Sequence, residues 1–102
     1  MLIILLLAGS LVLLAAGQAQ AMTYPVSIQN NAFNPKDLTI SAGDTVTWTN
    51  NDALLHDVDI HGLGESPDLR KGETYSMTFD RPGTYSYVCG IHPSMKGTVI
   101  VK

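Results

Sequence analysis

The sequence predicts an all-β domain, a sandwich or a barrel built from about seven or eight short strands. Apolar and polar residues alternate with a period of two in several short stretches after residue 22. Turn-forming residues separate these stretches at intervals of roughly eight to twelve residues. No stretch after residue 22 has the apolar spacing of an amphipathic helix.

The first half of the domain is expected to contain three strands. Val26 and Ile28 alternate with polar residues in the first strand, and Leu38 and Ile40 do so in the second. Residues 33–35, Phe-Asn-Pro, are expected to connect these two strands. Residues 45–49 are rich in β-branched and aromatic side chains, which favour a third strand.

The second half continues the pattern around a long loop. Residues 56–60 resume the alternation, so that His56, Val58 and Ile60 share one face. The stretch 62–72 contains three Gly and one Pro and is expected to be a loop with little regular structure. The remaining predicted strands are residues 74–79, 84–88 and 98–101.

The first 21 residues are expected to lie outside this domain. Residues 1–16 are almost wholly apolar, and Ala19 and Ala21 follow with a small-x-small pattern. This pattern is typical of a secretory signal peptide that is cleaved after Ala21, although no Lys or Arg precedes the apolar run. An uncleaved membrane anchor is the alternative, and membrane contact is expected only if the segment is retained. The mature domain would then be residues 22–102, in the periplasm or otherwise outside the cytoplasm.

Charge and cysteine content exclude some classes of function. The net charge is −3, and because no basic patch accompanies it, nucleic acid is not an expected partner. The chain has a single Cys, so an internal disulfide cannot form. In an oxidising compartment a lone Cys forms an intermolecular disulfide, is a reactive thiol or binds a metal.

The residues around that Cys favour a metal ligand. Cys89, His92 and Met95 lie at intervals of three residues between two predicted strands. Cys and Met are soft ligands and imidazole is borderline, a combination that suits copper. Tyr87 and Cys89 are expected to point inward together at the end of their strand. His56 points inward at the start of its own strand, so the two can meet at one end of a sandwich.

The chain resembles the cupredoxins, the small blue-copper proteins. The resemblance covers nearly all of residues 23–102, including Gly43-Asp44-Thr45-Val46-Thr47-Trp48, His56 and Pro82-Gly83-Thr84-Tyr85-Ser86-Tyr87. The Cys-x-x-His-x-x-Met spacing is most similar to that of the amicyanins. The resemblance implies an antiparallel Greek-key sandwich with one type 1 copper ion. Its implied ligands are His56, Cys89 and His92, with Met95 as a weak axial ligand. It also implies a monomeric, non-enzymatic carrier of single electrons outside the cytoplasm.

Two positions differ from the family pattern. Asp57 stands where Asn is common, so its side chain cannot donate a hydrogen bond unless protonated, and the tie to the Cys loop is expected to be weaker. Ile91 stands where Pro is frequent, and its N–H is expected to donate a second hydrogen bond to the Cys89 sulfur. Asp57 and Asp59 are expected to form a solvated face, and His61 to be a surface residue.

An apolar patch near the site is the candidate docking surface for redox proteins. Leu54, Leu55, Ile91 and Pro93 flank His56 and His92 in the sequence. The resemblance implies that electrons pass through the edge of His92. The alternative is that these residues only shield the metal from water.

Three other functions are weighed against electron transfer. A protein that delivers or buffers copper could use the same ligands, although the chain lacks the flexible Met or Cys clusters expected of a chaperone. A copper oxidase or nitrite reductase needs further His clusters, and only His61 remains unassigned. A metal-free interaction domain would show no copper–thiolate absorption.

Overall fold

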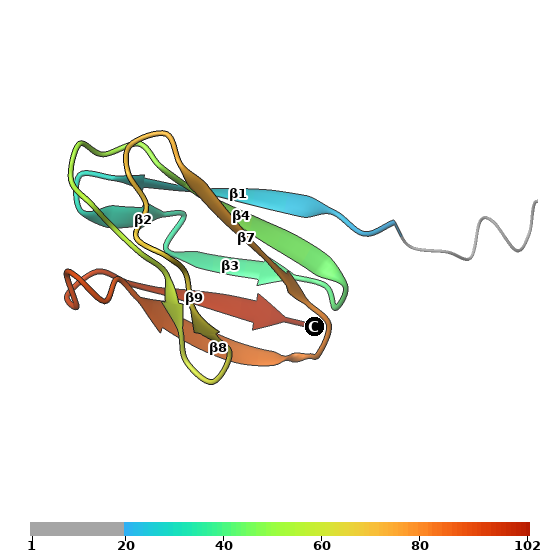
Figure 1. The fold of residues 1–102 in the computed structure, drawn as a ribbon. Helices are drawn as coiled ribbons and strands as arrows, with labels where there is room; N and C mark the ends of the chain where they lie inside the picture. The colour runs from blue at the N-terminus through green and yellow to red at the C-terminus, as the bar shows by residue number, and fades with distance from the viewer. Residues whose placement is uncertain (1–19) are drawn as a thin grey trace, which may run out of the picture.

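The computed structural model describes residues 20–102, and Figure 1 shows their fold. The predicted signal peptide lies outside the described residues except for Gln20 and Ala21. No helix long and apolar enough to cross a membrane occurs among the described residues. The nine strands are β1 (Thr23–Gln29), β2 (Ala32–Asn34), β3 (Asp37–Ile40), β4 (Asp44–Asn50), β5 (Asp59–Ile60), β6 (Gly64–Glu65), β7 (Thr74–Phe79), β8 (Gly83–Val88) and β9 (Lys96–Val101).

The strands form two sheets that pack as a sandwich, which confirms the predicted fold class. One sheet has the order β2-β1-β4-β7 and the other has the order β3-β9-β8-β5-β6. The sandwich is not wholly antiparallel, contrary to what the resemblance implied: both sheets are mixed, because β1 pairs with β4 and β3 pairs with β9 in parallel. The chain visits the opposite sheet as β3 before it returns as β4, so β4 can run in the same direction as β1.

Period-two alternation explains which residues form the core. In β4 the buried side chains alternate with partly exposed ones, and Val46 and Trp48 face inward. The ring of Tyr87 on β8 packs edge-on against Trp48 and Phe33, with centroid separations of 5.3 and 4.7 Å. These rings bridge the two sheets, since β4 and β8 belong to different layers.

Three local expectations need correction. Residues 33–35 are not merely a connection, because β2 pairs Phe33 with Ile28 of β1. Only residues 59–60 of the predicted strand 56–60 form a strand, whereas His56 makes an isolated bridge with Leu69. The predicted loop 62–72 contains β6 and this bridge partner. Side-chain alternation located the buried positions, but it did not distinguish a strand from a loop that pairs at a single residue.

The two loops that carry the predicted ligands lie at one end of the sandwich. In Figure 1, the loop between β4 and β5 and the loop between β8 and β9 meet at the end of the molecule opposite the C-terminus. The start of β1 lies at the C-terminal end. The fold thus separates the candidate site from the point where the domain begins.

Candidate metal centre

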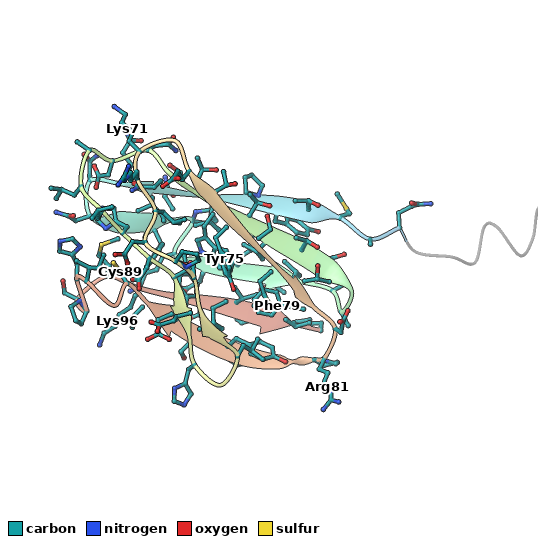
Figure 2. All side chains as sticks on the ribbon, viewed as in Figure 1. Lys71, Tyr75, Phe79, Arg81, Cys89 and Lys96 are labelled. Carbon is teal, nitrogen blue, oxygen red and sulfur yellow. The ribbon has the colours of Figure 1, made fainter. Side chains whose placement is uncertain are left out.

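Cys89 follows the last residue of β8 and points into the sandwich. Tyr87 and Cys89 are buried, whereas Ser86 on the other face is exposed, as the strand parity predicted. Figure 2 shows Cys89 at the ligand end of the molecule, the end at which Lys96 of β9 also lies. The sulfur is therefore held where the core meets the end loops.

Both predicted His residues face this sulfur. The Nδ1 atoms of His56 and His92 lie 3.7 and 3.8 Å from Cys89 Sγ. The three potential ligand atoms all lie within 4.8 Å of one another. His56 and Cys89 are 0% exposed and His92 is partly exposed. Residues from two loops more than thirty positions apart thus form one compact, largely buried cluster.

Met95 lies at the base of the same loop. It is buried, and its carbonyl oxygen accepts a hydrogen bond from the N–H of Cys89 at 3.1 Å. Its own N–H donates to the carbonyl oxygen of His92 at 2.9 Å. These bonds close the loop into a compact turn, so the fourth predicted ligand lies at the base of the loop that carries Cys89 and His92.

The orientation of His56 is set by an acidic neighbour. Its Nε2 atom lies 2.9 Å from Asp52 Oδ2. The backbone N–H of Asn31, followed by the imidazole of His56, holds the pKa of Asp52 below its ordinary value. Because a carboxylate can only accept, Nε2 carries the proton and Nδ1 keeps its lone pair directed toward Cys89. This is the tautomer that a metal ligand requires.

Asn50 organises the loop that carries His56, and the sequence reasoning missed it. This fully buried side chain donates to the carbonyl oxygens of Leu54 and Leu69 at 2.9 and 2.8 Å. Its oxygen accepts the N–H of Asp52 at 2.8 Å. The sequence did carry a signal, since Asn at the end of a strand often bonds the backbone two residues on.

Asp57 ties the two ligand loops together, contrary to both expectations for it. It is buried, at 5% exposure, rather than part of a solvated face. Its backbone N–H donates to Cys89 Sγ at 3.5 Å, as expected. Its carboxylate accepts the N–H of Gly90, so the side chain forms the tie as an acceptor instead of a donor. An Asp at this position therefore keeps a side-chain connection between the two loops, because the bond needs an acceptor oxygen and not a donor.

The expected hydrogen bond from Ile91 is not formed. Within residues 20–102, the backbone N–H that reaches the Cys89 sulfur is that of Asp57. Ile91 is instead an exposed apolar residue. His61 is also exposed, as predicted, and it does not belong to the ligand cluster.

The donor set fits a copper ion. Two imidazole nitrogens and one thiol sulfur converge at a buried point, and a thioether lies in the same loop. This mixture of borderline and soft donors is unsuited to Mg²⁺ or Ca²⁺, which prefer oxygen ligands. The hydrogen bond that His56 donates to Asp52 and the one that the Cys89 sulfur accepts are the kind of outer contacts that orient ligands in metal sites.

Several known proteins are similar to this chain in sequence and in fold. A family model described as a cupredoxin-like domain matches residues 2–101. Amicyanin-alpha of Methylorubrum extorquens is 44% identical over 94 residues, which span 86% of this chain and 79% of the relative.

Two solved structures extend the comparison. A reduced mutant of amicyanin superimposes with a TM-score of 0.75 at 36% identity, over 86% of this chain and 89% of that one. A copper-containing nitrite reductase from Thermus scotoductus gives a TM-score of 0.74 at 34% identity, but the match covers 82% of this chain and only 23% of the reductase. The similarity to the reductase is therefore confined to a minor part of that larger protein.

Proposed function

The chain belongs to the cupredoxin family, and on this premise we propose that it carries single electrons between redox proteins outside the cytoplasm. One bound copper ion would supply the reversible Cu(II)/Cu(I) couple. The observation that carries the proposal is the convergence of His56, Cys89 and His92 at one buried point, with their ligand atoms within 4.8 Å of one another.

We assign the strong ligands to these three residues and the weak axial ligand to Met95. The ring of His56 is held in place, since its Nε2 atom bonds Asp52 while its Nδ1 atom faces Cys89. The Cys89 sulfur accepts a hydrogen bond from Asp57, which withdraws electron density and favours the reduced state. A site held by hydrogen-bonded loops at the end of a rigid sandwich can retain its shape in both oxidation states, which is what a fast electron carrier needs.

The docking surface is proposed to be the apolar patch formed by Leu54, Leu55, Ile91 and Pro93. The first three are 51%, 44% and 42% exposed, and Pro93 is exposed as well. His92 lies between Ile91 and Pro93 and is the one partly exposed member of the ligand triad. A redox partner that covers this patch would therefore meet the edge of His92, so the edge is the proposed path for the electron.

Two alternatives remain open to experiment. Copper delivery would use the same residues, but the buried and braced ligands favour retention of the ion over its release. An enzymatic role would need additional His residues for a substrate-binding copper. The chain has three His in all, and His61 is exposed away from the cluster.

Copper reconstitution tests the proposal. The protein loaded with one equivalent of Cu(II) is expected to show an intense visible copper–thiolate band and a type 1 EPR spectrum. Cys89→Ser should abolish the band, and His56→Ala should abolish or shift it. The matched control, His61→Ala, should leave it unchanged. A normal band in Cys89→Ser, or none in the unmodified protein, would refute the assignment. Transfer of copper to a chelator in each redox cycle would favour delivery instead.

A further inference from the structure

A buried carboxylate accepts a hydrogen bond from the backbone of Met22, at the end of the sandwich opposite the ligands. Asp44, at the start of β4, is 4% exposed. Its Oδ1 atom accepts a hydrogen bond from the backbone nitrogen of Met22 at 2.9 Å. Its Oδ2 atom accepts the N–H of Ser41 at 2.9 Å. In the described part of the chain, no Lys, Arg or His side chain forms an ion pair with this carboxylate.

Met22 is also held through its carbonyl group, whereas the two residues before it are not held. The carbonyl oxygen of Met22 accepts the N–H of Thr45 at 2.9 Å, which extends the contact between β1 and β4. Gln20 and Ala21 are exposed and belong to no strand. The boundary between free and bound backbone thus coincides with the Ala21–Met22 peptide bond, where the sequence predicts cleavage.

We propose that a signal peptidase hydrolyses the Ala21–Met22 bond and that the new terminal ammonium group of Met22 pairs with Asp44. Water adds across the amide, so that Ala21 leaves with a carboxylate and Met22 keeps the nitrogen as an amine, which takes up a proton. The Met22 nitrogen already lies at hydrogen-bond distance from Asp44 Oδ1. Cleavage therefore replaces the amide donor of this hydrogen bond by an ammonium group and turns the contact into an ion pair without moving the chain.

The pairing has an energetic consequence. A buried carboxylate that lacks a cationic partner is destabilising, and removal of the signal segment would supply that partner. The carboxylate already accepts a charge-assisted hydrogen bond from the amide, and an ammonium donor adds the attraction between two opposite charges. The mature domain is therefore more stable when it begins at Met22 than when it begins elsewhere. This inference does not depend on copper.

The test has two parts, and both start from the full 102-residue precursor expressed in an exporting bacterium. The intact mass of the exported protein should correspond to residues 22–102. A mass that places the N-terminus at another residue, or that retains residues 1–21, would overturn the proposal.

The second part measures the ion pair. A precursor with Gly-Ser inserted after Ala21 yields a mature protein in which Met22 keeps an amide N–H and the ammonium lies two residues away. Asp44→Asn is made in both forms. The substitution should raise the unfolding equilibrium constant about tenfold more in the native form than in the extended form. Equal effects would overturn the pairing. If Asp44→Asn does not fold, the extended protein alone should unfold with a constant about tenfold higher than the native one, and equality would overturn it.

Discussion

The two halves of the candidate copper site are held in different ways. In the first half, His56 is buried, its ring donates to Asp52 and its backbone pairs with Leu69. The side chain of Asn50 donates to backbone carbonyl oxygens on both sides of His56. The other half, residues 89–95, is a short turn between β8 and β9 whose ends are buried and whose middle residues lie at the surface. It is joined to the first half through Asp57. We therefore expect the free energy of unfolding to depend mainly on the half that carries His56. The rate of electron exchange should depend mainly on the half that carries His92.

The largest loss of stability is expected when the buried half is broken at Asn50. Asn50→Ala removes three hydrogen bonds. The carbonyl oxygen of Leu54 loses the amide donor, whereas that of Leu69 still accepts the N–H of His56. The free energy of unfolding should fall by roughly 3 kcal/mol. Denaturant unfolding of the copper-free protein measures it, with Asn51→Ala as control because Asn51 is exposed. Equal losses in the two variants would contradict the role of Asn50.

A smaller loss of stability is expected at alkaline pH, through Tyr87, whose ring packs against Trp48 and Phe33 in the core. Burial raises the pKa of Tyr87 to about 12 from its ordinary value of 10. Because the folded state holds this proton more tightly than the unfolded state, the contribution is complete below pH 10 and is lost as the pH rises through 12. The free energy of unfolding should fall by roughly 2 kcal/mol across this range. Tyr87→Phe keeps the ring contacts and should remove this part of the decline, and an unchanged profile in that variant would contradict the assignment.

The tie between the halves is expected to contribute less. Asp57→Ala leaves the N–H of Gly90 without its acceptor, but water can reach Gly90, so the loss should be about 1 kcal/mol. Asp57→Asn keeps an acceptor oxygen and should lose less than half of that. Chemical denaturation of the copper-free variants distinguishes the two. If Asp57→Asn lowers the free energy of unfolding as much as Asp57→Ala does, the tie depends on the charge of Asp57 and not on its acceptor oxygen.

Changes in the surface half should leave stability almost unaffected. Ile91→Glu is expected to alter the free energy of unfolding by less than about 0.5 kcal/mol, because the side chain is exposed. The charge should, however, slow electron self-exchange between two copies about tenfold, since like charges would meet at the docking patch. NMR line broadening in mixtures of the oxidised and reduced protein measures this rate. Leu63→Glu is the control, because Leu63 is equally exposed but outside the patch, and equal slowing would argue against the proposed surface.

The sequence predicted which residues cluster at the candidate site, and three of the four signals were local. Cys89, His92 and Met95 lie within seven residues, so spacing alone identified them. Strand parity and the family resemblance then selected His56 over His61. The sandwich followed from period-two alternation and from turn residues, both of which are short-range patterns.

The supporting hydrogen bonds could not be predicted in the same way. Asn50 reaches Leu69 across 19 positions, and Asp57 reaches Gly90 across 33. No periodicity encodes such pairs, because they depend on how separate loops pack at the end of the sandwich. The parallel ladders β1–β4 and β3–β9 escaped prediction for a similar reason, since alternation marks a strand but not its partner.

Voltammetry of the copper-loaded protein tests the central claim most directly. A carrier whose ligands are braced on both sides should give a reversible one-electron wave, and its amplitude should persist through repeated cycles while copper stays bound. A chelator present in the solution should not lower the amplitude of the wave. An irreversible wave, or one that decays as the chelator takes up Cu(I), would contradict the account and favour copper delivery.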